Sequence, residues 1–445
     1  MTKISFNKVL NALLSLTIAF AIVGGDIQGV WAGTSMTELT RIANSKPIID
    51  QSFSGVGSNI NGPSLIRVPD WIKPENRPNP SAKYYLYFSH HNGENIRMAW
   101  AKNVEGPYTM YAPNKGVLKL GINVGRLKVS NHIASPDVIV DDENQRFIMY
   151  FHGGDVQWNG NKRGQSTVVA VSSNGLDFNG GVKESVLGKF YFRVFEHGGE
   201  LYAIAKEGWV YKAQNPSTPW ANPDGVNQNS KYVWTRSQNN PFSRIGKEVR
   251  HNAVYVTGET LHVYYSAYPD KPERILYSTI NLSGNWNNWN ASNPKTVLQP
   301  KMAWEGVNLP LKQSEEGSDT NVRQLRDPAF FKDINGSMYL LYTGKGEEAI
   351  GIAKFSGTTG ENQKPKVSFT KPVSGNVGQD LGVLVNASDQ DGSIAKVDLF
   401  IDNRANRQAS QHGRRGVIRM PLRGGGGLQD DLALGRRSTL DPQAQ

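Results

Sequence analysis

The stretch Tyr84-Tyr85-Leu86-Tyr87-Phe88-Ser89 decides the fold, because similar runs return four more times along the chain. Each run is a short series of aromatic and aliphatic residues that ends in a small or polar one, which is typical of a buried strand. The later runs are centred on Tyr150, Ile204, Tyr264 and Leu341, at intervals of 54 to 77 residues. A regular recurrence over this distance indicates an architecture built from equal units.

Each unit contains more than one strand. A shorter apolar run and a turn precede the aromatic run, as in residues 137–144, and a third run follows it, as in Ile96–Lys102 and Thr167–Ser173. Turn pairs such as Asn335-Gly336 separate the runs. Five units of three or four antiparallel strands predict an all-β fold, a five-bladed β-propeller over residues 33–355. A β-sandwich with long loops is the alternative, but it does not explain the equal units.

The two ends of the chain differ from this body. Residues 1–32 carry Lys3 and Lys8, then an apolar run and small residues before Gly33, which predicts a secretory signal peptide. We therefore expect a secreted or periplasmic protein with no membrane segment after cleavage. A polar linker over 356–364 leads to 365–402, where alternating residues predict three strands of a partial β-sandwich. Residues 403–445 are rich in Arg, Gln and Gly, which predicts a disordered basic tail.

Charge and composition exclude several classes of function. The net charge is +10, but residues 403–445 carry half of it, with eight Arg and three Asp. The rest of the chain therefore lacks the concentrated positive charge that binding to nucleic acid needs. The chain has no Cys, which excludes disulfides, thiolate metal sites and Cys nucleophiles. It also has no GxSxG or HExxH motif and no phosphate-binding loop.

Candidate functional residues follow from propeller geometry. Inner strands start at one rim of the central tunnel and second strands end there, so side chains distant in sequence converge. Strand starts and ends supply His, Arg and Asp at this rim: His90, His91, Asp137, His152, Arg193, Arg250, His251, Arg326 and Asp327. A buried charge must be paired or used. The cluster is therefore either a functional site or a ring of ion pairs that holds the blades in register.

Two of these strand starts carry a resemblance to a known family. The motifs SPDVIVD (135–141) and RDPAFF (326–331) resemble those of the five-bladed glycoside hydrolases of families 43, 62 and 117, over roughly residues 55–355. The resemblance implies hydrolysis of glycosidic bonds by a carboxylate base, a carboxylic acid and a helper Asp. Asp137 matches the helper, and Asp327 is a second axial carboxylate. Residues 365–402 resemble a bacterial immunoglobulin-like module.

The chain departs from this pattern in blade one. The families' base Asp lies at the start of the first inner strand, where this sequence has Asn61-Gly62-Pro63-Ser64. Glu248 and His251 are the candidate proton donors, since His titrates near neutrality. His90, His91, His152 and His251 could also meet around one metal ion, although hydrogen bonding to sugar hydroxyls is the preferred interpretation. A Ca²⁺ or Na⁺ ion in the tunnel is common in the resembled families and has no signal in the sequence.

The remaining polar and aromatic candidates suit a sugar. We expect His90, His91 and His152 to hydrogen-bond hydroxyl groups and Trp158 to stack on a ring. The three arginines 193, 250 and 326 would favour an acidic or sulfated polysaccharide. The leading hypothesis is a secreted glycoside hydrolase acting on plant or algal wall oligosaccharides by carboxylate and His acid–base catalysis. The alternative is a non-catalytic carbohydrate-binding propeller.

Overall fold

The computed structural model describes residues 35–91, 93–221, 232–317 and 320–357, together with strands at 20–21, 366–371, 380–388, 396–401, 404–410 and 415–423. The chain divides into two compact units. One comprises Thr34–Gly357, and the other comprises Met1–Gly33 with Thr358–Gln445.

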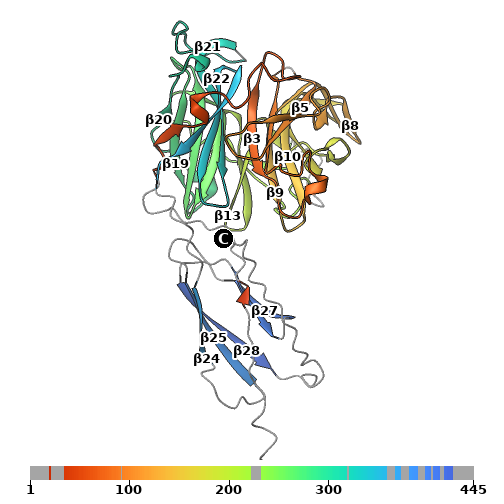
Figure 1. The fold of residues 1–445 in the computed structure, drawn as a ribbon, viewed down its shortest axis with the longest axis vertical. Coiled ribbons are helices and arrows are strands. Elements are labelled where there is room, and N and C mark those ends of the chain that lie inside the picture. Colours follow the sequence, from red (N-terminus) through yellow and green to blue (C-terminus); the bar gives the residue numbers. More distant parts are fainter. Residues whose placement is uncertain are drawn as a thin grey trace, which may run out of the picture. The chain divides into compact units, whose positions relative to one another are not determined.

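Five antiparallel sheets form the larger unit, which confirms the five-bladed propeller (Figure 1). Blade one contains β3 (Asn61–Arg67), β4 (Tyr84–Ser89), β5 (Asn95–Ala101) and β6 (Thr109–Tyr111), with β7 (Leu118–Lys119) on β5. Blade two contains β9 (Leu127–Asp141), β10 (Arg146–Trp158), β11 (Asn161–Ser172) and β12 (Gly188–Lys189), with β8 (Ile122–Val124) on β9. Blade three contains β13 (Arg193–His197), β14 (Glu200–Ile204), β15 (Val210–Lys212) and β16 (Thr235–Arg236). Blade four contains β17 (Glu248–Thr257), β18 (Thr260–Tyr268), β19 (Ile275–Asn281) and β20 (Lys295–Leu298). Blade five contains β21 (Thr320–Lys332), β22 (Met338–Gly346), β23 (Ala349–Phe355) and β2 (Leu39–Arg41).

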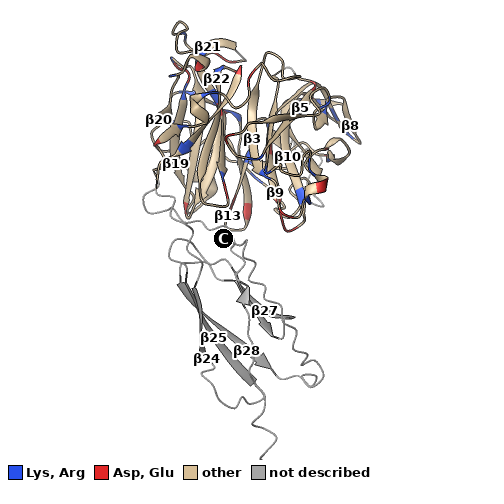
Figure 2. Ribbon diagram, in the orientation of Figure 1, with Lys and Arg blue, Asp and Glu red and all other residues tan. Residues whose placement is uncertain are grey.

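The aromatic runs are the second strands of the blades, as the sequence predicted. Tyr87, Tyr150 and Tyr264 are almost fully buried on these strands and pack between neighbouring sheets. Burying a large side chain stabilises a fold by roughly 1.5–3 kcal/mol. The inner strands contact one another around the axis, and β3 and β9 lie side by side in Figure 1. Acidic and basic residues are interspersed along the ribbons of these blades in Figure 2.

Four inner strands share a backbone irregularity, which lies within β3, β9 and β21 and just before β13. Gly62, Ser135, Tyr191 and Asp327 have left-handed backbones, with φ of 58°, 51°, 66° and 48°. Three of them precede a proline, and in those three blades the pairing with the second strand shifts by one residue. A bulge of this kind bends the strand and changes the direction of its side chains. Because Gly62 lies against Ser135 and Asp327, and Tyr191 lies against His251, these segments converge, and we refer to this place as the axial mouth.

An N-terminal strand completes the ring. β2 adds to the outer edge of blade five, with Leu39 paired to Phe355 and Arg41 to Ala353. The Arg41 guanidinium donates to both oxygens of the buried Glu305, at 2.6 and 2.9 Å. The hydroxyl of Tyr342 donates to the same carboxylate at 2.8 Å. Glu305 thus links β2 to blade five through hydrogen bonds.

The smaller unit contains β1 (Phe20–Ala21), β24 (Lys366–Lys371), β25 (Asp380–Ser388), β26 (Lys396–Ile401), β27 (Arg404–Ser410) and β28 (Arg415–Arg423). They form two sheets in the orders β1-β26-β27 and β24-β25-β28. Strands occur at the three places predicted in 365–402, and the immunoglobulin-like arrangement stays a prediction. β27 and β28 fall within the predicted disordered tail.

The other predictions for the two ends stay untested. The rest of the tail and, apart from β1, the predicted signal peptide lie outside the described residues. Within the described part of the chain, no helix is long and apolar enough to span a bilayer.

Candidate functional site

A histidine and an aspartate from neighbouring inner strands meet at the mouth. His251 on β17 directs Nδ1 at Oδ1 of Asp327 on β21, and both side chains are buried. The other oxygen of Asp327 accepts the backbone N–H of Gly62 at 3.3 Å and the Thr343 hydroxyl at 3.4 Å. The contact with Asp327 is a close ion-pair approach, and neither ring nitrogen of His251 has hydrogen-bond geometry with any described residue. Burial lowers the pKa of His251, although the Asp327 charge opposes this shift.

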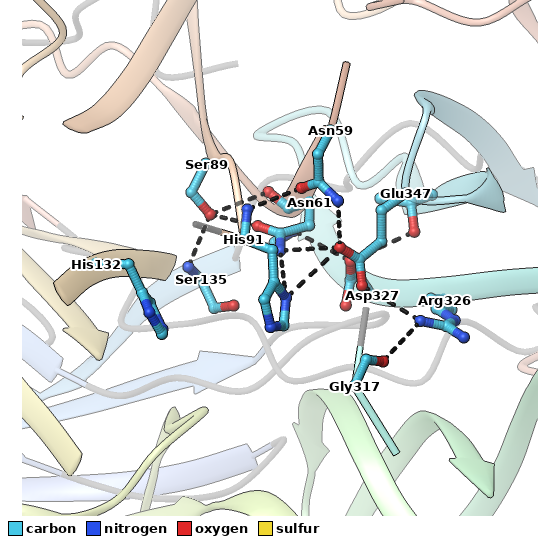
Figure 3. Close-up of polar contacts among 12 residues, drawn as sticks. Asn59, Asn61, Ser89, His91, His132, Ser135, Gly317, Arg326, Asp327 and Glu347 are labelled. Carbon is cyan, nitrogen blue, oxygen red and sulfur yellow. Dashed lines mark hydrogen bonds and ion pairs between the residues drawn. The ribbon is translucent and has the colours of Figure 1, made fainter. Parts of the chain in front are cut away.

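A second carboxylate reaches the same place from the turn between β22 and β23. Figure 3 shows Asn59, Asn61 and His91 of blade one converging on Glu347. The Asn59 amide donates to Oε2 at 2.8 Å, the Asn61 amide at 3.3 Å, and Nδ1 of His91 lies 3.6 Å from the same oxygen. Glu347 thus brings a carboxylate to the start of β3, where the sequence has an amide instead of the family's Asp.

The pKa values of this second pair shift in opposite directions. Burial would raise the pKa of Glu347, but hydrogen bonding and charge from His91, with Arg326 and Asn59, hold it well below its usual range. Burial would lower the pKa of His91, but the hydrogen bond and charge of Glu347 outweigh it and raise the pKa. His91 is therefore the more basic of the two histidines and His251 the less basic.

Two predicted arginines lie beside these pairs and are already bound. Arg250 and Arg326 share the buried Glu273, with N–O distances of 2.9 and 3.2 Å. Both also donate to the carbonyl of Gly317, at 2.8 and 3.1 Å, and Arg326 lies 3.4 Å from Glu347. The two positive charges are thus offset by two carboxylates within the cluster.

Further rings line the mouth between His91 and His251. Nε2 of His132 lies 3.3 Å from Nε2 of His152, and the ring of His132 is 5.9 Å from that of His91. Tyr191 packs against His152 at 4.9 Å and against His251 at 4.0 Å between ring centres. Burial lowers the pKa of His132 to about 4 and that of His152 well below its ordinary value. These two imidazoles are therefore neutral at pH 7.

Asp137 and Arg193 occupy the axis instead of the mouth. The Arg193 guanidinium donates to the carbonyls of Pro136, Asn252 and Pro63, at 2.7, 3.0 and 3.3 Å, and lies 3.3 Å from Asp137. These carbonyls come from three blades, so one side chain links three inner strands. Burial raises the pKa of Asp137, with Arg193 and the Val194 N–H opposing it.

A tunnel cation does not fit this arrangement. The carbonyl oxygens that would coordinate Ca²⁺ or Na⁺ around the axis are bound by the Arg193 guanidinium, which already carries a positive charge there. Among the described residues, no three His, Asp or Glu side chains are arranged to hold a metal ion.

Three predicted residues remain, Glu248, Trp158 and His90. Glu248 accepts hydrogen bonds from Lys206 and Tyr268. Burial would raise its pKa, but the Lys206 and Tyr268 hydrogen bonds lower it, so Glu248 stays ionised at neutral pH. Trp158 ends β10, and the Arg126 guanidinium covers its ring at 4.5 Å. His90 follows β4 and is half-buried, with a pKa lowered by burial and by Arg97.

Sequence reasoning missed Glu347, Tyr191 and His132. Glu347 follows the predicted second-strand end at Thr343–Lys345, and the turn into the third strand lies at the same rim. Tyr191 directly precedes the strand start at Phe192-Arg193, and His132 lies three residues before Ser135. A search widened by three residues at each strand end would have found all three.

Solved structures with some likeness to this chain include several carbohydrate-active enzymes. A GH43 β-xylosidase/α-arabinofuranosidase from a compost microbial metagenome is 13% identical, covering 72% of this chain and 97% of its own, with a TM-score of 0.45. An α-L-arabinofuranosidase from Lactobacillus brevis is 13% identical, covering 73% and 93%, with a TM-score of 0.43. The assignment of five blades rests on this chain's own strand pairing.

A viral protein is a closer relative in sequence, whereas no family model matches the chain. Uncharacterized protein R118 of Acanthamoeba polyphaga mimivirus is 33% identical over 315 residues, which cover 66% of this chain and 83% of the relative. Identity at this level over most of the relative's length establishes common descent, and the chain therefore belongs to the same family as the mimivirus protein R118.

Proposed function

We propose that this chain hydrolyses glycosidic bonds at the axial mouth of its propeller. The observation that carries the proposal is the His251–Asp327 pair, in which the carboxylate lies against Nδ1 as an ion-pair partner and Nε2 has no described partner. An imidazole fixed in this way has one defined nitrogen for proton transfer. The motifs at Asp137 and Asp327, which resemble those of five-bladed glycoside hydrolases, add support for this class of reaction.

The opposed pKa shifts suggest how the two histidines divide the work. His251, whose pKa is lowered, is neutral near pH 7 and accepts a proton from water at Nε2. His91, whose pKa is raised by Glu347, carries a proton and gives it to the leaving glycosidic oxygen. The water oxygen bonds to the anomeric carbon as the bond to the leaving oxygen breaks. Glu347 and Asp327 stabilise the positive charge that develops on the sugar.

We propose a neutral oligosaccharide from a plant or algal wall as the substrate. The acidic or sulfated sugar suggested by the sequence would need an available guanidinium fork. Arg193, Arg250 and Arg326 instead donate to carbonyls and carboxylates of the protein. Breaking such buried pairs to bind a sulfate would be costly.

The test is release of reducing ends from xylan, arabinan and carrageenan by the wild type and by Asp327→Asn. The amide keeps the size of the side chain but no longer favours the required His251 tautomer. We expect release from a neutral polymer and a loss of at least about 100-fold in the variant. Glu259→Gln, at an exposed position on blade four, is the control and should match the wild type. Equal rates in wild type and Asp327→Asn would contradict the proposal.

The second candidate is a carbohydrate-binding propeller that does not cleave. Two observations favour it: Asn61 stands at the start of blade one, and the carboxylates of Asp137, Asp327 and Glu347 are all paired within the protein. The same assay separates the two functions. Retention of the polymer with no release of reducing ends, in wild type and Asp327→Asn alike, would support this second function.

We also propose that the protein is exported, on the basis of residues 1–32. The pattern of Lys3, Lys8 and a following apolar run is that of a secretory signal. Expression of the full chain, followed by N-terminal sequencing of the exported protein, should find a first residue near Gly33. Retention of the intact N-terminus in the cytoplasm would contradict this proposal.

A further inference from the structure

The backbone of Tyr191 lies in a conformation that a bulky residue rarely adopts. Its φ is 66°, in the left-handed region where a Cβ meets the backbone, and such outliers concentrate at functional sites. Gly62, Ser135 and Asp327 have the same conformation at the starts of other inner strands. The fold therefore imposes this geometry at the rim, and blade three uses the position to present an aromatic ring.

The ring of Tyr191 fixes neighbouring side chains. It packs against His251 with 4.0 Å between ring centres, and against Phe190 at 4.6 Å and His152 at 4.9 Å. His251 is thus held by the Asp327 carboxylate at one nitrogen and by the tyrosine ring at its side. Burial by such rings is also what lowers the pKa of His251.

The hydroxyl of Tyr191 has no assigned role in the folded protein. It makes no hydrogen bond to any described residue, although Tyr191 is 8% exposed. Burial and the charges of Glu347 and Asp327 raise the pKa of Tyr191, while Arg250 and Arg326 oppose this. The phenol therefore keeps its proton and remains a hydrogen-bond donor near the Glu347 and Asp327 carboxylates. Unlike the hydroxyl of Tyr85, that of Tyr191 is not fully enclosed, so a ligand oxygen can accept its hydrogen.

We propose that Tyr191 binds the substrate, by donating its hydroxyl hydrogen to an oxygen of the sugar, and that its ring positions His251. This inference rests on the glycosidase function proposed above. It adds a recognition residue beside the proton-transfer groups, and the hydroxyl of that residue donates to a hydroxyl or ring oxygen of the sugar.

Two substitutions separate the two parts of the inference. Tyr191→Phe removes only the hydroxyl, and it should weaken binding of xylan or arabinan oligosaccharides by roughly 3- to 10-fold, the effect of one hydrogen bond. The pH profile should not change. Tyr191→Ala also removes the ring, and the NMR titration of His251 without sugar should move to higher pH as its burial is lost. Tyr85→Phe is the matched control, because its buried hydroxyl also lacks a described partner but lies on β4 away from the mouth.

The outcomes distinguish this inference from the function on which it rests. If the wild type binds or cleaves an oligosaccharide and Tyr191→Phe does so equally well, Tyr191 does not contact the sugar, although the proposed function stands. An unchanged His251 titration in Tyr191→Ala would overturn the positioning role. If the wild type neither binds nor cleaves any of the polymers, both the function and the inference fail.

Discussion

At the scale of single residues, two histidines at the mouth differ in pKa because their surroundings differ. His251 is buried with Asp327 and its pKa is lowered, whereas His91 is partly exposed beside Glu347 and its pKa is raised. Two groups of the same chemical type thus hold different protonation states at one pH. This difference is what an acid–base pair needs.

The pH dependence of activity should reflect this pair. Activity requires neutral His251 and protonated His91, so we expect a bell-shaped profile. Its acid limb should lie below pH 6.5 and its alkaline limb above it. Because the Asp327 charge raises the pKa of His251, the residual activity of Asp327→Asn should have its acid limb at lower pH. Initial rates from pH 4 to 9 test this, and a profile flat over that range would contradict the assignment.

Arg193 should be the most important single side chain at the axis. Arg193→Met removes the donor to three carbonyls and leaves Asp137 without its ion-pair partner in a buried place. We expect the free energy of unfolding in urea to fall by about 3–5 kcal/mol. Arg126→Met, which breaks an exposed pair with Glu184, should cost less than about 1 kcal/mol. Similar losses in the two variants would show that Arg193 does not link the blades.

At the scale of elements, three inner strands contain a bulge next to a residue with a left-handed backbone, and in blade one that residue is a glycine. A Cβ on Gly62 would lie 2.6 Å from Cα of Ser135 in the next blade, and the φ of 58° is itself unfavourable for other residues. Blades one and two approach closely at this point. The absence of a side chain is thus a packing requirement of the rim.

Gly62→Ala should therefore destabilise the propeller more than the backbone conformation alone explains. Gly160 also has a left-handed backbone, with φ of 76°, but no heavy atom lies within 4 Å of its would-be Cβ. Gly160→Ala should cost only the conformational part, about 1–2 kcal/mol. We expect a clearly larger loss for Gly62→Ala in thermal or urea unfolding. Equal losses would contradict the close approach of the two blades.

The sequence predicted the strands better than it predicted the site. Aromatic runs such as 84–89 specify buried strands through local composition, and the structure has β4 at these residues. The partners of the polar side chains depend on closure of the ring, which has no local signal. Glu347 and Asn59 are 288 residues apart in sequence, yet they share a hydrogen bond. The partners of Glu248 lack a local signal for the same reason, since Lys206 comes from another blade.

At the scale of the whole molecule, the buried neutral histidines should make the fold sensitive to acid. Burial lowers the pKa of His262 and His132 to about 4, from an ordinary value of 6.5. The unfolded chain therefore binds these protons first as the pH falls. The contribution of these two histidines to the free energy of unfolding should be constant above pH 6.5 and should fall between pH 6.5 and 4, by up to about 3 kcal/mol for His262.

Urea unfolding at pH 7.5, 6, 5 and 4 measures this dependence. His262→Asn removes one such group and should flatten the curve in the acid range. The raised pKa of His91 acts in the opposite direction, since its stabilisation is present at low pH and is lost as the pH rises through its folded value. Stability that rises on acidification to pH 4 would contradict the account of the buried imidazoles.

Closure of the ring by β2 should be needed for the stability of the whole propeller. Arg41→Ala leaves the buried Glu305 without its guanidinium partner and frees the closing strand. We expect a loss of about 3–5 kcal/mol in urea unfolding. Arg41→Lys, which keeps the charge but only one donor group, should lose less. An Arg41→Ala variant as stable as the wild type would show that the ring closes without this contact.

The central claim is that the five inner strands bring their starting residues together at one axial mouth that binds a sugar. The most direct measurement is the NMR spectrum of the histidine rings during addition of xylan or arabinan oligosaccharides. The account predicts that the signals of His91 and His251 shift together, while those of His197, at the end of β13, and His262, near the start of β18, do not. Shifts at His197 or His262 with none at His91 and His251 would contradict it.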